Sequence, residues 1–371
     1  MKKYKILDLF CGAGGFSKGF EETNRATTKI ALDFNKKAIN TFNYNFPKAN
    51  GICGDIKNTS IKNEIIKLSK KEKIDIIIGG PPCQGFSNKG KKLGLNDERN
   101  FLFLEYVDLV NKIRPKIFVI ENVKTLVSTA NNYFIKEIEK VFLEIGYEIQ
   151  YKVLNAYDFG TPQKRERVFI IGKEKDVATN IDLNNCFPNK NDYKEKYTVM
   201  DAISDLAFLE SGEGELWQDY PIVAHTNYQK EMRKNSKKLN WHMATKHKDI
   251  AIEKLKLIPP ECGKECLPKK MLGNQKFNTT WGRLIWNEPS GTIDTRFDTP
   301  SNGRNSHPYL NRAITPREAA RLQGFPDDFC FLGNKSEVCK QIGNAVPIPL
   351  SKAIANSIIK ELDNSLKNKE E

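Results

Sequence analysis

The chain has 371 residues, more than one hydrophobic core usually organises, so we expect two domains or one domain with a large insertion. Its 59 Lys and Arg against 46 Asp and Glu give a net charge of +13, which favours a polyanionic partner. No apolar stretch approaches the ~20 residues that span a bilayer, the N-terminus runs straight into an expected strand, and the eight cysteines are too sparse for a disulfide framework. These features exclude a membrane protein and a disulfide-rich secreted protein, so we expect a cytoplasmic one.

The first half of the chain alternates between expected strands and helices. Strands are expected at residues 4–10, 29–33, 74–78, 116–120, 147–155 and 167–171, with one more ending near 54–56. Helices are expected at residues 15–22, 36–46, 61–71, 101–113 and 133–145. This alternation predicts an α/β fold with a doubly wound, mainly parallel sheet covered by helices on both faces.

The character of the chain changes after about residue 173. Residues 175–300 are rich in Asn, Lys, Asp and Pro, contain all four tryptophans, and show only weak periodicity. Helical periodicity returns at residues 315–323 and 350–362. We therefore predict one domain built from residues 1–175 together with about 335–371, and a second, smaller, loop-rich domain over about 176–334.

Three consecutive strand ends in the first half carry groups that could hold a nucleoside. The segment Gly12-Ala13-Gly14-Gly15 lets backbone approach a ligand closely, but Ser17 stands where a dinucleotide fingerprint needs its third glycine, which disfavours NAD. Asp33 ends the second strand at a distance suited to ribose hydroxyls, and Asp55 with Ile56 ends the third, where an adenine amino group would lie. The pattern fits S-adenosylmethionine; a tight turn with surface acids is the alternative.

A cysteine follows the expected strand at 74–78. The strand is stopped by Gly79-Gly80-Pro81-Pro82, and Cys83 comes next. The two prolines fix φ and hold the following side chain in a rigid turn, at the sheet edge where open α/β folds bind their ligands. A nucleophile and a buried structural thiol are both consistent with this segment alone.

The neighbouring strand ends in an acid. Residues 117–120 are apolar and lead into Glu121, so a partly desolvated carboxyl group suited to proton donation is expected at the same sheet edge as Cys83. Arg165 and Arg167, in the segment 163–167, flank the start of another strand and are suited to bind a phosphate or a carbonyl oxygen.

Six motifs in this chain resemble the ordered motifs of DNA (cytosine-5)-methyltransferases, in particular the bacterial type II restriction-modification enzymes. They are Phe10-Cys11-Gly12-Ala13-Gly14-Gly15, Gly80-Pro81-Pro82-Cys83-Gln84, Glu121-Asn122-Val123, Gln163-Lys164-Arg165-Glu166-Arg167, Arg317-Glu318-Ala319-Ala320-Arg321-Leu322-Gln323-Gly324-Phe325-Pro326 and Gln341-Ile342-Gly343-Asn344-Ala345-Val346-Pro347. They span residues 4 to about 360 in the family's order. Only about 175–280 is unmatched, as expected of the family's variable target-recognition region.

The resemblance implies methyl transfer from S-adenosylmethionine to C5 of a flipped-out cytosine in a short, specific double-stranded DNA sequence. Cys83 would attack C6 as a thiolate, because C5 is a poor nucleophile until C6 carries an adduct. Glu121 would protonate N3. Arg165 would hold the O2 side of the ring and favour the thiolate, and Arg167 belongs to the same predicted catalytic set.

The resemblance also implies binding residues. For the cofactor they are Phe10, Gly12, Gly14, Gly15, Asp33, Phe34, Asp55, Ile56, Pro81, Leu102 and Asn344. For DNA they are Gln84, Ser87, Lys89, Arg99 and Arg167. Phe34 departs from the relatives that carry Trp there, which bears on adenine stacking. The loop 88–100 resembles the family's catalytic loop that closes over DNA; a solvated charged loop is the alternative.

Other functions fit the motifs less well. A tRNA cytosine-5 methyltransferase would carry a Cys-Phe-Thr signature, which the chain lacks, and a non-catalytic DNA-binding relative would not need Cys83, Glu121 and Arg165 intact. Cys262 and Cys266 with His242 and His247 upstream could be read as a zinc site, but the spacings match no common finger, so no metal is expected. The expected partners are double-stranded DNA and, acting separately, a cognate restriction endonuclease; we expect a monomer in the prokaryotic cytoplasm or nucleoid.

Overall fold

The computed structural model describes residues 3–82, 101–128, 133–176, 180–273 and 278–367. The chain divides into two compact units. Unit 1 comprises Met1–Asn155, Glu166–Asp192 and Ile348–Glu371, and unit 2 comprises Ala156–Arg165 and Tyr193–Pro347. Within the described part of the chain, no helix combines the length and the apolar character needed to cross a membrane.

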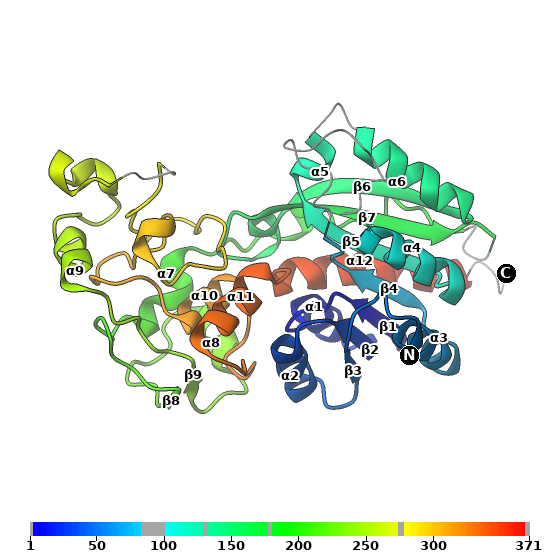
Figure 1. Cartoon of the computed structure of the whole chain (residues 1–371), viewed down its shortest axis with the longest axis horizontal. Coiled ribbons are helices and arrows are strands. Elements are labelled where there is room, and N and C mark those ends of the chain that lie inside the picture. Colours follow the sequence, from blue (N-terminus) through cyan, green and yellow to red (C-terminus); the bar gives the residue numbers. More distant parts are fainter. Residues whose placement is uncertain (1–2, 83–100, 129–132, 177–179, 274–277, 368–371) are drawn as a thin grey trace. The chain divides into compact units, whose positions relative to one another are not determined.

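Unit 1 is built around a seven-stranded sheet. Its strands are β1 (Tyr4–Leu9), β2 (Ala26–Asp33), β3 (Asn50–Cys53), β4 (Ile76–Gly79), β5 (Ile117–Val123), β6 (Tyr147–Asn155) and β7 (Glu166–Glu174). Its helices are α1 (Gly15–Glu21), α2 (Lys36–Asn45), α3 (Thr59–Glu72), α4 (Phe101–Ile113), α5 (Thr125–Ser128), α6 (Tyr133–Glu144) and α12 (Ile348–Lys367), and they flank the sheet (Figure 1).

The strand order is β3-β2-β1-β4-β5-β7-β6. The pairs from β3 to β5 are parallel, while β7 runs antiparallel to both β5 and β6. Every residue of β4 is buried, as expected of a central parallel strand covered by helices on both faces. The predicted doubly wound, mainly parallel sheet is confirmed.

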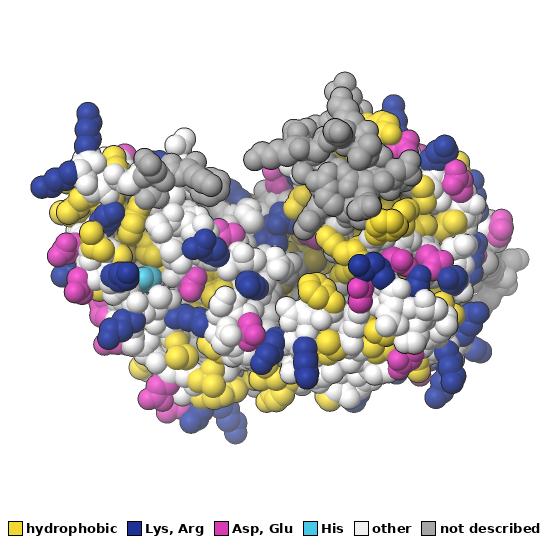
Figure 2. Space-filling model, in the orientation of Figure 1, with side chains coloured by type: hydrophobic (Ala, Val, Ile, Leu, Met, Phe, Trp, Pro, Cys, Tyr) yellow, Lys and Arg dark blue, Asp and Glu magenta, His cyan; other side chains and the backbone are white. Residues whose placement is uncertain are grey.

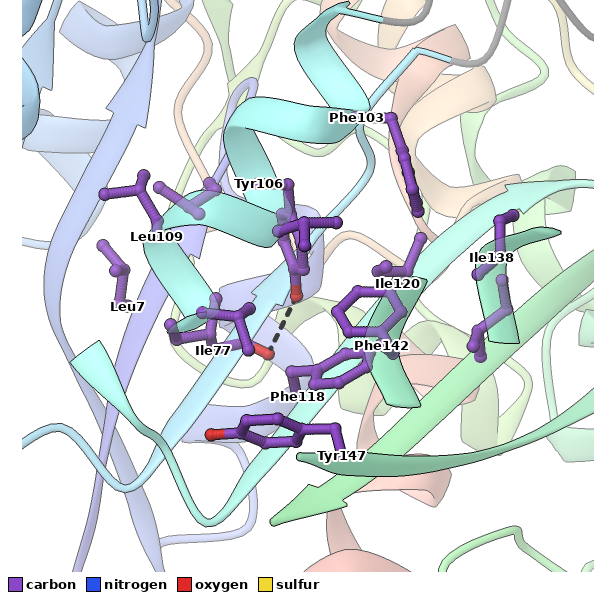
Figure 3. Packing of buried hydrophobic residues seen from close by; sticks show 14 of the residues in the cluster. Leu7, Ile77, Phe103, Tyr106, Leu109, Phe118, Ile120, Ile138, Phe142 and Tyr147 are labelled. Carbon is purple, nitrogen blue, oxygen red and sulfur yellow. Dashed lines mark hydrogen bonds between the residues drawn. The ribbon is translucent and has the colours of Figure 1, made fainter. Parts of the chain in front are cut away.

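One face of the sheet holds an aromatic core beneath α4 and α6. The Phe118 ring of β5 stacks on Phe142 of α6 with centroids 4.1 Å apart (Figure 3). Tyr106 of α4 is fully buried, and its hydroxyl donates to the carbonyl oxygens of Ile77 at 3.3 Å and Val119 at 3.2 Å. A buried hydroxyl with these partners avoids the cost of an unsatisfied donor and ties α4 to β4 and β5. These two strands lead to the segments with Cys83 and Glu121.

Helix α12 packs against α1 at very short range. A Cβ atom on Gly19 would lie 2.4 Å from the Cβ of Ser351, so only glycine fits at this crossing. The Ser351 hydroxyl donates to the carbonyl oxygen of Phe16 at 2.6 Å. The last helix therefore belongs to the core of unit 1, although it is far from the rest of that unit in the sequence.

Unit 2 has short elements joined by long loops. Its helices are α7 (Val199–Ile203), α8 (Asn227–Arg233), α9 (Asp249–Lys256), α10 (Pro316–Leu322) and α11 (Lys335–Asn344), and β8 (Trp217–Gln218) pairs with β9 (Leu239–Asn240). Buried ion pairs connect its loops. Arg321 donates to Asp205 at 2.6 Å and to Asp327 at 2.6 Å, and all three side chains are fully buried. Fully paired charges of this kind fix one packing arrangement among the loops.

Candidate active site

The carboxyl ends of β4 and β5 meet through the backbone that follows β4. The Asn122 side-chain amide donates to the carbonyl oxygen of Pro81 at 2.9 Å. A Cβ atom built on Gly80 would lie 3.5 Å from Oε2 of Glu121. The Gly80–Pro81 backbone is thus held against the end of β5, as two neighbouring parallel strands require.

Several predicted residues lie just beyond this point. Cys83, Gln84, Ser87, Lys89 and Arg99 lie outside the described residues. Their predicted roles stay predictions. Pro81 is buried, and Leu102 of α4 is partly buried against the core of unit 1.

Glu121 forms an ion pair with Arg167. The Arg167 Nε lies 3.0 Å from Oε1 of Glu121, and the two side chains are only 16% and 13% exposed. In the antiparallel β5–β7 pair, Arg167 is opposite Val123, two residues along from Glu121, so both side chains lie on the same face as diagonal neighbours. The sheet register therefore places a guanidinium beside the carboxylate at a desolvated strand edge.

Arg165 has a different environment. It precedes β7 and belongs to unit 2, where its guanidinium donates to the carbonyl oxygens of Ile293 at 3.0 Å and Gly343 at 2.9 Å. Its side chain is almost fully buried. Arg167 is the arginine of this motif that belongs to unit 1, and it pairs with Glu121 there.

The turn after β1 uses left-handed backbone. Gly12 has φ +54° and Gly14 has φ +96°, and α1 begins at the next residue, Gly15. A Cβ atom on Gly14 would lie 2.5 Å from the Phe46 ring, whereas one on Gly12 would have no atom within 4 Å. Gly14 is required by packing and backbone conformation, while Gly12 faces open space. Phe10 also has positive φ, at +61°, and is partly buried.

Asp33 joins the ends of β1 and β2. Its Oδ2 accepts from the Gly12 backbone N–H at 2.9 Å, and its Oδ1 accepts from that of Asn35 at 2.8 Å. Burial raises the pKa of Asp33, and the backbone hydrogen bonds oppose that shift. Phe34 follows with a ring that is 77% exposed. Gly12, the Asp33 carboxylate and the exposed Phe34 ring thus lie at the carboxyl ends of the neighbouring strands β1 and β2.

The remaining predicted cofactor residues differ in how far they are exposed to solvent. Asp55 is exposed and accepts from the backbone N–H of Lys57 at 3.0 Å, whereas Ile56 is buried in the core of unit 1. Asn344 is the exposed last residue of α11 in unit 2.

Sequence reasoning missed one buried acid near the glycine turn. Asp8 of β1 is 1% exposed and accepts a hydrogen bond from the Ser17 hydroxyl at 2.6 Å. Burial raises the pKa of Asp8 to about 7. The sequence signal for Asp8 is an acid inside an otherwise apolar strand.

The seven-stranded sheet, with its glycine turn after β1 and a carboxylate at the end of β2, defines the methyltransferase fold. A family model for C-5 cytosine-specific DNA methylase matches residues 4–360. The chain belongs to this family and is a DNA (cytosine-5)-methyltransferase, which confirms the family and the enzyme class predicted from the motifs.

Individual relatives agree along the whole chain. The type II methyltransferase M.DdeI of Desulfomicrobium norvegicum is 35% identical, with 95% of this chain and 88% of the relative covered. The type II methyltransferase M1.HphI of Haemophilus parahaemolyticus is 34% identical, with 95% and 86% covered. Among solved structures, a prophage-encoded candidate DNA modification methyltransferase of E. coli superposes with a TM-score of 0.77 at 27% identity, with 97% of this chain and 100% of that chain covered.

Proposed function

We propose that this enzyme transfers a methyl group from S-adenosylmethionine to C5 of a flipped-out cytosine within a short, specific double-stranded DNA sequence, through a covalent bond between Cys83 and C6. The observation that carries the proposal is the Glu121–Arg167 ion pair beside the Gly80–Pro81 backbone. That backbone leads directly into Cys83 in the sequence.

The pair suits the polarisation of a cytosine ring. Glu121 is held in place by Arg167 and has few contacts with solvent, so a proton shared between its carboxyl group and N3 of cytosine would not be lost to water. The Arg167 guanidinium presents further N–H donors, which suit a carbonyl oxygen such as O2 of the same ring. We assign this clamp to Arg167; the guanidinium of Arg165, the residue that the motifs predict at O2, donates to the carbonyl oxygens of Ile293 and Gly343 in unit 2.

On the protein side, the bond-making and proton-transfer steps of the proposed reaction use only Cys83 and Glu121. The Cys83 thiolate adds to C6, which forms the S–C6 bond and breaks the C5=C6 π bond, while N3 takes a proton from Glu121. When bound, S-adenosylmethionine would supply the methyl group that C5 receives; its sulfonium–methyl bond would break and S-adenosylhomocysteine would be left. Loss of the C5 proton to solvent water or hydroxide then restores the C5=C6 double bond and breaks the S–C6 bond, so Cys83 leaves as a thiolate and N3 returns its proton to Glu121. No step requires a metal ion.

The turn after β1 and the end of β2 fit the proposed cofactor. The open space at Gly12 allows a ligand to approach the backbone, and the Asp33 carboxylate suits ribose hydroxyls. The exposed Phe34 ring offers a face for adenine stacking. Phe10, Gly14, Gly15, Asp55, Ile56, Pro81, Leu102 and Asn344 complete the proposed set.

Duplex DNA is the proposed substrate because its phosphates complement a chain with a net charge of +13. Figure 2 shows Lys and Arg side chains spread over the visible face of both units. C6 of a stacked base is out of reach, so the cytosine must leave the helix before Cys83 can attack. We propose unit 2 as the target-recognition part, unit 1 as the catalytic part, and a monomer that acts apart from any restriction endonuclease.

The decisive experiment is expression in a host that lacks cytosine methylation, followed by sequencing of its DNA with detection of 5-methylcytosine. The proposal expects complete methylation of one cytosine in one short sequence context. A Cys83→Ser variant should give no methylation while it still binds cofactor and duplex DNA. Methylation confined to RNA, or unchanged methylation by Cys83→Ser, would contradict the proposal.

A further inference from the structure

Unit 2 contains a group of potential metal ligands that the methyl-transfer reaction does not use. Cys262, Glu265 and Cys266 lie in a turn after α9, and their two sulfurs and a carboxylate oxygen all lie within 4.8 Å of one another. Within the described part of the chain, no other group of three or more His, Cys, Asp or Glu side chains converges in this way. Both cysteines are free thiols.

The turn itself brings the carboxylate to the sulfurs. The backbone N–H of Gly263 donates to Oε1 of Glu265 at 2.6 Å, so the glutamate side chain folds back over the turn. The backbone N–H of Cys266 donates to the carbonyl oxygen of Gly263 at 3.1 Å, which closes the turn beneath both thiols. A Cβ atom on Gly263 would lie 2.9 Å from Oε2 of Glu265, so a side chain there would displace the carboxylate.

The base of the turn is anchored to the rest of unit 2. The carbonyl oxygen of Cys262 accepts from the backbone N–H of Arg283 at 2.9 Å. The buried Arg283 guanidinium in turn donates to the carbonyl oxygens of Ile258 and Leu255, both at 2.8 Å. Cys262 also packs against the small hydrophobic cluster that includes Trp281. One ligand is therefore rigidly placed, while Glu265 and Cys266 are exposed and can adjust.

The chemistry of this group favours a thiophilic cation. Thiolate sulfur and carboxylate oxygen are both ligand types that bind Zn²⁺, with Zn–S near ~2.3 Å and Zn–O near ~2.0 Å. Such bonds put ligand atoms roughly 3.5–4 Å apart, so the observed group needs only a small contraction, and its exposed side leaves room for water as the fourth ligand.

His242 and His247, which precede these cysteines in the sequence, have other partners. The His242 Nδ1 lies 3.0 Å from the Thr315 hydroxyl, and the His247 Nε2 accepts from the backbone N–H of Ala313 at 3.0 Å. Neither belongs to the converging group. The structure thus replaces a His-Cys ligand set, which matched no finger spacing, with a compact Cys-Glu-Cys turn.

We propose that Cys262, Glu265 and Cys266 form a binding site for one thiophilic divalent cation of the Zn²⁺ class, separate from the methyl-transfer centre. Binding forms two metal–sulfur bonds and one metal–oxygen bond, and each protonated thiol releases its proton to solvent. The ion would hold the 262–266 turn in place next to the hydrogen bonds that Arg283 makes with Cys262, Ile258 and Leu255.

The test uses the full-length, reduced protein with Cys83→Ser as the common background, which removes the reactive nucleophile from the measurement. Titration with Cd²⁺ should give a thiolate-to-metal charge-transfer band that saturates at one ion per chain, and Zn²⁺ should displace it. Adding Cys262→Ser or Cys266→Ser should weaken binding at least 10-fold and remove most of the band. Adding Glu265→Gln should weaken binding about 10-fold while the band is kept.

Cys53→Ser is the matched control, because Cys53 is an exposed free thiol in unit 1. It should leave both the stoichiometry and the affinity unchanged. Circular dichroism of each variant establishes that the chain is folded, and Gly263→Ala gives a further variant that keeps all three ligands but moves Glu265. An unchanged titration in Cys262→Ser and Cys266→Ser would overturn the proposal. So would a disulfide between the two cysteines in protein isolated without added reductant.

Discussion

The Nε atom of Arg167 lies 3.0 Å from Oε1 of Glu121, across the antiparallel pair β5–β7. Both residues are at the strand edge where the Gly80–Pro81 backbone arrives from β4. An ion pair this little exposed keeps its geometry better than a surface pair, because water competes less for either partner. We propose that this pair holds the cytosine ring.

Arg167→Ala should lower the rate of methyl transfer by about 100-fold or more, the usual cost of removing one preorganised donor at a reacting group. Arg167→Lys should recover little activity, because an ammonium group does not reproduce the planar donor pair of the guanidinium. Single-turnover methylation of duplex DNA at saturating cofactor measures the effect.

Lys124→Ala is the matched control for this experiment. Lys124 pairs with Glu166 at 2.9 Å near the same strands, but both side chains are about half exposed. Its loss should change the rate less than twofold. If Arg165→Ala abolished turnover at unchanged stability while Arg167→Ala remained active, the clamp would belong to Arg165 instead.

The fold was predictable because its strongest signals are local. The apolar runs of β4 and β5 and the alternation of strands with helices are enough to predict a parallel, doubly wound sheet. For the edge strand β3, the sequence predicts the end but not the start, because Asn50–Cys53 is short, half exposed and weakly apolar. The motif order then identified the family.

The environments of the two arginines were not predictable in the same way. Side chains two residues apart point to the same face only when both residues belong to one strand. Because β7 begins at Glu166, Arg167 lies in the strand and Arg165 lies before it. Arg165 instead meets carbonyl oxygens of Ile293 and Gly343, more than a hundred residues later in the chain. Contacts between residues so far apart in the sequence depend on the paths of the loops between them, and the spacing of apolar residues does not predict those paths.

Asp33→Asn should weaken S-adenosylmethionine binding about 10- to 100-fold at pH 8, because the hydrogen bonds from ribose hydroxyls would lose a charged acceptor. Burial raises the pKa of Asp33, so wild-type affinity should fall as the pH is lowered through that pKa and the carboxylate takes up a proton. In Asp33→Asn this pH dependence should disappear. Isothermal titration calorimetry between pH 5 and pH 8 measures both effects.

The control is Glu72→Gln, at the end of α3, where Glu72 pairs with Lys5 near the opposite end of β1. It should bind cofactor as the wild type does. Equal affinity of Asp33→Asn and wild type at pH 8 would argue against Asp33 as a cofactor ligand.

Asp8→Asn should stabilise the protein at alkaline pH. The buried Asp8 keeps its proton up to about pH 7, whereas the unfolded chain releases it near the ordinary value of 3.8. The native state therefore binds more protons between these values, so the Asp8 contribution makes the free energy of unfolding fall as pH rises through this window. The total loss is at most about 4 kcal/mol.

Asparagine at position 8 does not titrate, and its side-chain oxygen can still accept the hydrogen bond from the Ser17 hydroxyl. Urea unfolding followed by circular dichroism should show that the stability of Asp8→Asn relative to wild type increases from pH 5 to pH 8. A difference between the two proteins that stays constant over this range would show that Asp8 does not titrate there.

Arg321→Met should destabilise unit 2 by about 3–5 kcal/mol, because it leaves the carboxylates of Asp205 and Asp327 buried without their shared cation. All four tryptophans belong to unit 2, so tryptophan fluorescence during urea unfolding reports on that unit. Lys234→Ala removes an exposed pair with Glu231 and should shift stability by less than about 1 kcal/mol. Cofactor affinity measured on folded Arg321→Met reports on unit 1, and it should match the wild type. An unfolding midpoint equal to that of Lys234→Ala would mean that the buried pairs do not hold unit 2 together.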